Sequence, residues 1–377
     1  MSEMSYLEKL LDGVEVEWLP LGEVSALRRG KVMSKGYLTE NFGPYPVYSS
    51  QTANNGKIGS INTFDFDGEY ISWTTDGANA GTVFYRTGKF SITNVCGLIT
   101  LKSKYPLIYK FLFYWLTIEA KKHVYSGMGN PKLMSHQVEN IPVPIPCPDN
   151  PEKSLAIQSE IVRILDKFTA LTAELTAELN MRKKQYNYYR DQLLSFKEGE
   201  VEWKTLGDIS IKIASGRNKS RKSEGEYPVY GSTGLIGSTD KAAYSGKLIL
   251  VARVGAYAGL VNAVAGHFDV SDNTLIIQPS DRWNVRFAFH QLTYMNLNQY
   301  AVGAGQPLIT GGFLKNLMVP LPSLDEQTRI ANILDKFDTL TNSITEGLPR
   351  EIELRQKQYE YYRDMLFSFP KPEVAEA

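Results

Sequence analysis

The sequence has little cysteine, little histidine, no net charge and no long hydrophobic run. Two cysteines, Cys96 and Cys147, cannot form a disulfide framework, and the four histidines lack the spacing of metal ligands. Lys and Arg (41) balance Asp and Glu (41), which excludes a basic character over the whole chain but leaves local basic patches open. The apolar run at residues 107–118 is too short and too mixed to span a bilayer, and no signal peptide is recognisable. We expect a cytoplasmic protein.

Common catalytic motifs are also missing. There is no Walker-type glycine loop, no GxGxxG opening a helix after a strand, and no Asn/Asp-Pro-Pro-aromatic tetrad of an amino-methyltransferase. Glu202-Trp203-Lys204 has a Glu-x-Lys spacing that a nuclease uses for metal, but the matching segment of the internal repeat is Glu17-Trp18-Leu19. A structural turn is therefore the favoured interpretation, and we expect neither catalytic residues nor a bound metal in this chain.

The sequence contains an internal duplication of one unit. Six ordered pairs of segments match at an offset that drifts from 185 to 176 residues, as small loop insertions would produce. The pairs are Val16–Gly22 with Val201–Gly207, Tyr45–Tyr48 with Tyr227–Tyr230, Gly56–Gly59 with Gly234–Gly237, Gly77–Gly81 with Gly255–Gly259, Gly127–Pro131 with Gly303–Pro307, and Val143–Pro146 with Val319–Pro322. Chance does not produce six such matches in order.

Two long amphipathic segments follow the two copies. Apolar residues at 157, 161, 164, 168, 171 and 175 are spaced as in the narrow seam of a coiled coil, and residues 330–344 keep the same rhythm. A narrow seam needs a partner of matching length, so we expect the two helices to pack on each other. Gly347-Leu348-Pro349 should break or kink the second helix.

The repeats predict an α+β fold: two pseudo-symmetric β-rich domains separated by two long antiparallel coiled-coil helices, in a circular arrangement. Short strand-like runs split by Gly and Asn turns make up each domain, and Leu10–Trp18 resembles the exit from the first long helix. The predicted parts are an N-terminal segment completing the C-terminal helical unit (1–14), domain 1 (15–148), the central helix (149–198), domain 2 (199–322), the C-terminal helix (323–369) and a flexible tail (370–377).

Basic residues gather at matching places in the two domains. The second carries Lys212, Arg217, Lys219, Arg221 and Lys222, and the first carries Arg28, Arg29, Lys31 and Lys35. Flexible basic loops suit phosphate contacts, which give affinity and register on DNA. The alternative is a solvated charged loop, but recurrence in both copies favours the DNA interpretation.

The glycine-flanked loops differ between the copies in their polar residues, which predicts that one scaffold reads two different short sequences. Neutral drift of loops is the alternative. The full set of candidate DNA-contacting residues is Arg28, Arg29, Lys31, Ser50, Gln51, Thr75, Asn79, Asn130 and Lys132 in the first copy, and Arg217, Asn218, Lys219, Arg221, Lys222, Ser232, Thr233, Arg253, Tyr257 and Gln306 in the second.

The chain resembles the specificity subunit of a type I restriction–modification enzyme in its two domains, two long helices and circular repeat. The run Thr172–Leu179 (TAELTAEL) resembles the TAEL repeats of the type IC group. The helix ends YYRDQLLSF and YYRDMLFSF share in this resemblance, which covers essentially the whole chain. It implies that each domain is a target recognition domain for half of a split DNA site. It also implies that the spacer residues Thr172, Leu175, Thr176 and Leu179 adjust the gap between the halves.

The resemblance further implies a non-catalytic subunit that binds no cofactor. Its expected partners are double-stranded DNA, two methyltransferase (modification) subunits using S-adenosylmethionine, and two restriction (translocase and nuclease) subunits using ATP and Mg²⁺. Tyr188 and Tyr361 lie off the helical seam and are candidates for docking the methyltransferase subunits, although packing between the helices is the alternative use of such tyrosines. A protein scaffold whose two heads bind proteins rather than DNA is the alternative function.

Overall fold

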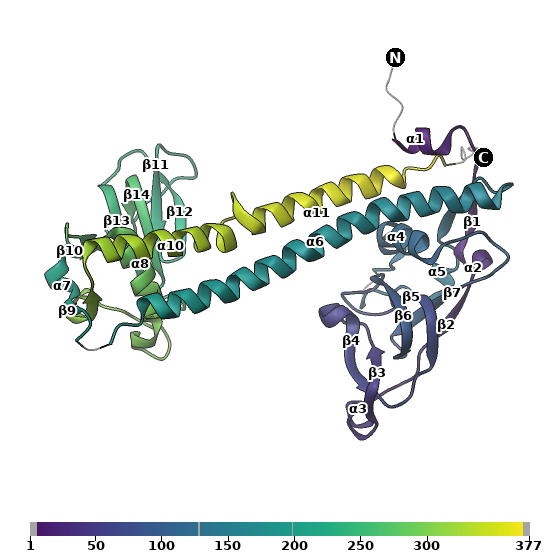
Figure 1. The fold of residues 1–377 in the computed structure, drawn as a ribbon, viewed down its shortest axis with the longest axis horizontal. Coiled ribbons are helices and arrows are strands. Elements are labelled where there is room, and N and C mark those ends of the chain that lie inside the picture. Colours follow the sequence, from purple (N-terminus) through teal and green to yellow (C-terminus); the bar gives the residue numbers. More distant parts are fainter. Residues whose placement is uncertain (1–5, 127–128, 198, 372–377) are drawn as a thin grey trace, which may run out of the picture. The chain divides into compact units, whose positions relative to one another are not determined.

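The computed structural model describes residues 6–126, 129–197 and 199–371 (Figure 1). These residues form two compact units: unit 1 is made of residues 1–173 and 353–377, and unit 2 of residues 174–352. Parts of four predictions lie outside the described residues, namely the beginning of the N-terminal segment (1–5), two residues of the glycine-rich match (127–128), the last residue of the central helix (198) and most of the tail (372–377).

Unit 1 consists of a six-stranded sheet, a separate pair of strands and the helices that pack on them. Its elements before the long helix are α1 (Tyr6–Leu11), β1 (Val16–Pro20), α2 (Leu21–Val24), β2 (Ser25–Arg29), α3 (Lys35–Glu40), β3 (Phe42–Tyr48), η1 (Ala53–Gly56), β4 (Lys57–Ile61), β5 (Phe66–Thr74), β6 (Val83–Ile92), β7 (Cys96–Leu101), α4 (Tyr109–Glu119), η2 (Ala120–His123), α5 (Ser135–Val138) and β8 (Pro142–Pro146). The sheet has the order β2-β7-β5-β6-β3-β4, and β1 pairs with β8 separately.

The sheet of unit 1 is mixed and has a core on each face. β3 and β6 run parallel, and the other neighbours run antiparallel. Because successive residues of a strand point to opposite faces, Ile71 and Trp73 join the main core with α4, whereas Phe90 and Leu98 belong to a smaller core on the other face. The sheet is thereby packed on both of its faces.

Unit 2 repeats this topology strand for strand. Its elements are β9 (Glu202–Thr205), α7 (Leu206–Ile209), β10 (Ser210–Ser215), β11 (Tyr227–Gly231), β12 (Gly234–Thr239), β13 (Tyr244–Ala252), β14 (Val261–Val270), β15 (Thr274–Pro279), α8 (Val285–Tyr294), η3 (Leu297–Tyr300), α9 (Gly311–Asn316), β16 (Met318–Leu321) and α10 (Leu324–Asn342). The sheet order is β10-β15-β13-β14-β11-β12, with β9 and β16 as a separate pair. The duplication predicted from the sequence, and with it the fold class, is confirmed.

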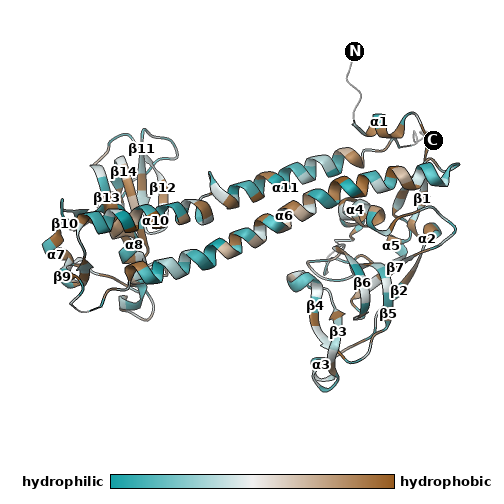
Figure 2. Ribbon diagram, in the orientation of Figure 1, coloured by the Kyte–Doolittle hydropathy of each residue, from teal (hydrophilic) through white to brown (hydrophobic). Residues whose placement is uncertain are grey.

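The long helix α6 runs without interruption from Pro151 to Leu194, and hydrophilic residues alternate with hydrophobic ones along it (Figure 2). Asn150 accepts a hydrogen bond from the backbone of Lys153 at its start, with proline at the first helical position, a favoured combination at helix N-termini. The second helical segment is divided into α10 and α11 (Gly347–Leu366), so the predicted break is present. Gly347 has φ +79°, and a Cβ there would lie 2.4 Å from the carbonyl oxygen of Thr339, so a side chain at this position is strained and blocked.

Helix pairing is antiparallel inside each unit. In unit 1 the ring of Phe168 on α6 stacks on Tyr362 of α11 at 5.3 Å, and Leu366 lies in one core with Ile161. In unit 2 the ring of Tyr189 on α6 stacks on Phe337 of α10 at 5.6 Å. The buried stripe is wider than predicted near the start of α6, where Leu165 is also buried, because that end of the helix covers α4 as well as α11.

The two ends of the described chain meet in unit 1, as the circular repeat predicts. The hydroxyl of Tyr6 donates to Glu160 on α6 at 3.0 Å, and Leu7 and Leu11 lie in the same core as Phe369. The indole of Trp18 donates to the carbonyl oxygen of Pro370 at 2.9 Å. Among the helices of the described residues, none is both long and apolar enough to cross a membrane.

Candidate nucleic-acid interface

In each unit the loops that follow the strands are joined into one edge by backbone hydrogen bonds, and we call this set the loop edge. In unit 1 the bonds run from Thr93 N to Tyr48 O (2.9 Å), from Thr75 N to Val95 O (3.1 Å) and from Leu133 N to Thr75 O (2.9 Å). Unit 2 repeats all three, from Ser271 N to Tyr230 O (2.8 Å), from Arg253 N to Asn273 O (2.9 Å) and from Ile309 N to Arg253 O (2.9 Å). The two loop edges therefore share one backbone scaffold.

A close approach of the backbone, shared by both units, positions the basic segment beside each loop edge. A Cβ on Gly30 would lie 2.2 Å from the carbonyl oxygen of Ile92, and one on Gly216 would lie 2.2 Å from that of Ser271. Only glycine allows the chain to pass so near the neighbouring turn. The basic residues that flank these glycines are thus fixed next to the loops rather than tethered loosely to the sheet.

The basic candidates of unit 1 have different partners. Arg28 is exposed and makes no ion pair within the described residues. Arg29 donates from Nη2 to the carbonyl oxygen of Asn94 at 2.7 Å and to Thr75 at 3.3 Å, so it ties two loops together. Lys31 pairs with Asp65 at 2.5 Å, and the hydrogen bond that it donates to this carboxylate raises the pKa of Lys31.

The polar candidates of unit 1 largely form hydrogen bonds inside the unit. Gln51 donates to the carbonyl oxygen of Lys57 at 2.6 Å, and Asn79 donates to that of Ser50 at 3.2 Å. The side chain of Thr75 is fully buried, and its hydroxyl lies 2.5 Å from Asp76. Thr75 thus stabilises the loop edge from within, and its contact with DNA stays a prediction. Ser50 is half-buried, Asn130 is exposed, and Lys132 joins Tyr125 through paired backbone hydrogen bonds.

In unit 2 the candidates divide in the same way. The amide of Asn218 donates to Asp269 at 2.7 Å, the hydroxyl of Ser232 donates to the carbonyl oxygen of Asn273 at 2.9 Å, and Lys222 pairs with Asp240. These side chains support the scaffold. The remaining candidates make no ion pair within the described residues, and most are exposed: Arg217, Lys219, Arg221, Thr233, Arg253, Tyr257 and Gln306.

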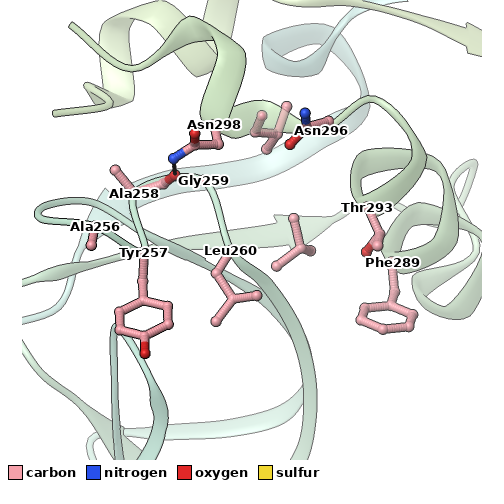
Figure 3. Close-up of a pocket in the computed structure, with 11 residues that line it drawn as sticks. Ala256, Tyr257, Ala258, Gly259, Leu260, Phe289, Thr293, Asn296 and Asn298 are labelled. Carbon is pink, nitrogen blue, oxygen red and sulfur yellow. Dashed lines mark hydrogen bonds between the residues drawn. The ribbon is translucent and has the colours of Figure 1, made fainter. Parts of the chain in front are cut away.

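A shallow apolar pocket of about 400 Å³ opens beside the loop edge of unit 2 (Figure 3). It lies between the β13–β14 loop and the segment from α8 to η3, with Phe289 and Thr293 on the helical side. The amide of Asn298 donates to the carbonyl oxygen of Ala258 at 2.7 Å and fixes the loop. The exposed rings and methyl groups of Tyr257 and Leu260 suit contact with a base face or a thymine methyl group.

Several polar features of the loop edge were not predicted. Asn54 and Asn55 form a left-handed turn after β3, and Arg86 lies buried beneath it. The Asn-Asn-Gly triplet is itself a turn signal in the sequence. No sequence motif marks Arg86 as a buried residue. The repeat does indicate it, because the equivalent residue of unit 2 is the apolar Val264.

No metal site accompanies these loops in the part of the chain that the structure describes, where no group of three His, Cys, Asp or Glu side chains has suitable geometry. Glu202 and Lys204 pair with each other at 2.8 Å on β9, and Glu202 also accepts from Arg282. The segment is part of strand β9 and not the structural turn that we expected.

Comparisons with known proteins agree on one family. The family model described as "Type I restriction modification DNA specificity domain" matches residues 13–182 and 198–354. The specificity subunit of the type I restriction enzyme EcoR124I/EcoR124II from Escherichia coli is 42% identical, with 99% of each chain covered. The EcoprrI specificity subunit from the same organism is 44% identical, over 92% of this chain and 93% of that subunit.

A solved structure shares the fold. The S subunit of a type I restriction–modification system from M. genitalium superposes with a TM-score of 0.68, covering 98% of this chain and 100% of the other. Its sequence identity is 17%, so this likeness concerns the fold alone.

Proposed function

The chain belongs to the family of type I restriction–modification DNA specificity subunits, and from this premise we propose that it reads a split DNA site, one half with each unit. The observation that carries this proposal is the pair of loop edges. They share strand order and interloop hydrogen bonds but carry different side chains. Identical scaffolds with different exposed groups are suited to reading two different short sequences.

The helices are proposed to set the gap between the two half-sites. The continuous helix α6 contributes residues to both units, and the repeated TAEL segment lies within it. A continuous helix transmits a fixed rise and rotation per residue, which a flexible linker does not. A bipartite site with a defined spacing is the expected consequence.

Catalysis is assigned to partner subunits. We expect this chain to bind no cofactor and to direct adenine methylation by two modification subunits, which use S-adenosylmethionine. Restriction belongs to two further subunits that use ATP and Mg²⁺. Supporting this division, the relatives are themselves named specificity subunits. Exposed tyrosines on the helices, Tyr188 (62% exposed) and Tyr361 (66%), are the proposed contacts to the modification subunits.

The test is to co-express the chain with its cognate modification subunit and to map methyl-adenine in genomic DNA by long-read sequencing. We expect one motif with two short half-sites around a fixed unspecified gap. Exchanging residues 198–322 for those of a relative should change one half-site and leave the other half and the gap unchanged. An intact complex that methylates no split motif would contradict the proposal and favour a protein scaffold instead.

A further inference from the structure

Unit 1 holds a buried cation where unit 2 holds an apolar residue. Arg86 on β6 pairs across the sheet with Tyr70, and its side chain is 3% exposed. At the equivalent rung of unit 2, Leu248 pairs with Val264, which lies in the small core on that face. The two copies of one scaffold thus differ here by a full charge in a buried position.

Folding stability alone does not account for Arg86. Its guanidinium lies 3.6 Å from the ring centroid of Tyr48 and 4.5 Å from that of Phe84, but it pairs with no carboxylate within the described residues. Burial lowers the pKa of Arg86 to about 10, so the side chain still carries its charge at neutral pH. A buried charge without an opposite charge is unfavourable, and apolar replacement of buried ionic groups is often neutral or stabilising.

The charge is instead directed at the turn between β3 and β4. Nη1 of Arg86 donates to the carbonyl oxygen of Asn55 at 2.8 Å, and a Cβ on Gly56 would lie 3.0 Å from Nη2. Asn54 and Asn55 both have left-handed backbones, with φ of 49° and 55°. The backbone N–H of Ser49 donates to the carbonyl oxygen of Gly56 at 2.9 Å and closes the turn above the guanidinium.

This turn presents two free amides. The side chains of Asn54 and Asn55 are exposed and make no hydrogen bond within the described residues, in contrast to the amides of Gln51 and Asn79. An asparagine amide presents an N–H donor beside a carbonyl acceptor, the pattern that matches N7 and the N6 amino group of adenine in the major groove. Unit 2 joins the equivalent strands between Gly231 and Gly234, without an asparagine pair.

We propose that the Asn54–Asn55 turn of unit 1 reads an adenine in the major groove of duplex DNA, and that Arg86 is its positioning residue. The inference rests on the proposed function and deepens it, because it assigns one base of one half-site to a named turn. Arg86 does not touch the DNA. It sets the height and orientation of the two amides through the carbonyl oxygen of Asn55.

The first experiment removes the amides and keeps the turn. The double variant Asn54→Gly, Asn55→Gly retains the left-handed backbone, because glycine adopts positive φ without strain. In the complex with the modification subunit, methyl-adenine mapping should show that discrimination at one A·T pair of one half-site falls by roughly ten- to hundredfold. The other half-site and the gap should be unchanged.

The second experiment separates positioning from support of the fold. Arg86→Met should leave the melting temperature of the complex equal or higher, and should relax the same base pair as the double glycine variant. Arg86→Lys keeps a cation that is able to donate to the carbonyl oxygen of Asn55, and should restore part of the discrimination. A methionine variant that melts earlier and reads the parent motif would overturn the positioning role.

A matched control is Asn62→Ala, which removes an exposed asparagine amide at the opposite end of β4 and should leave the motif unchanged. If the parent methylates a split motif that the double glycine variant reads identically, this inference is wrong and the proposed function stands. If the parent complex methylates no split motif, the proposed function itself fails. The two failures are thus distinguishable.

Discussion

At the scale of single residues, unit 2 contains a histidine whose charge state affects stability. His290 on α8 is 1% exposed, its Nε2 lies 2.6 Å from Asp335 on α10, and its Nδ1 has no hydrogen-bond partner among the described residues. Arg286 donates to the same carboxylate at 2.7 Å and 2.9 Å. Burial lowers the pKa of His290 below its usual value, and the positive charge of Arg286 lowers it further, against the hydrogen bond and negative charge of Asp335, which raise it.

The pH dependence follows from the direction of that shift. The unfolded chain binds a proton at His290 more readily than the folded one, so unfolding is favoured as the pH falls below about 6.5. We expect the melting temperature of unit 2 to be lower at pH 5.5 than at pH 7.5, and we expect part of this difference to depend on His290. Thermal unfolding of the full chain, followed by circular dichroism at both pH values, measures it.

The internal repeat provides the control variant. At the equivalent place in unit 1, the hydroxyl of Tyr114 donates to Asp166 at 2.7 Å, so tyrosine performs the same packing without titrating near neutrality. His290→Tyr and His290→Gln should both reduce the difference in melting temperature between pH 7.5 and 5.5, whatever they do to stability at pH 7.5. If both variants show the same difference in melting temperature as the parent chain, the pH dependence belongs to other groups.

Much of the scaffold could be predicted from the sequence, but the direction of the polar side chains could not. Equivalent segments had to form equivalent elements, so the repeat predicted two matching sheets. Loop amides and hydroxyls, however, also satisfy buried backbone groups, and the choice between backbone and solvent depends on distant neighbours. Thr75 and Gln51 bond inward for this reason, and Arg86 is buried against the rings of Tyr48 and Phe84, which are distant from it in the sequence or unmarked by any motif.

At the scale of elements, the TAEL repeat makes the length of α6 adjustable. Four residues of α-helix correspond to a rise of about 6 Å and a residual rotation of about 40°. Deleting Thr176–Leu179 should therefore shorten the gap in the methylated motif by one or two base pairs and leave both half-sites unchanged, because none of these residues lies in a loop edge.

The matched change is the insertion of one further Thr-Ala-Glu-Leu after Leu179, which should lengthen the gap by a similar amount. Methylation mapping of both variants alongside the parent tests the sign as well as the size of the effect. A variant whose half-sites change while its gap stays constant would contradict the spacer role of the helix.

At the scale of the whole molecule, the duplication predicts two equivalent attachment points for partner subunits. Tyr188 stands against Tyr189 with a ring separation of 5.4 Å and an interplanar angle of 76°, and Tyr361 stands against Tyr362 at 5.4 Å and 77°. In each pair the second tyrosine stacks on a phenylalanine of its own unit, whereas the first is left largely exposed. Aromatic side chains in such a position are typical anchors of protein interfaces.

If each exposed tyrosine anchors one modification subunit, the loss of partners should be stepwise. Tyr188→Ala or Tyr361→Ala alone should convert a complex with two modification subunits into one that retains a single subunit at limiting concentration, and the double variant should retain none. Truncating an interface hot spot typically weakens binding by about 2 kcal/mol or more, roughly thirtyfold in Kd. Native mass spectrometry counts the subunits directly. Tyr125→Ala is the control, because Tyr125 is also 66% exposed but lies opposite Lys132 in unit 1 rather than on a helix. A double variant that keeps both subunits would show that the modification subunits bind elsewhere on the chain.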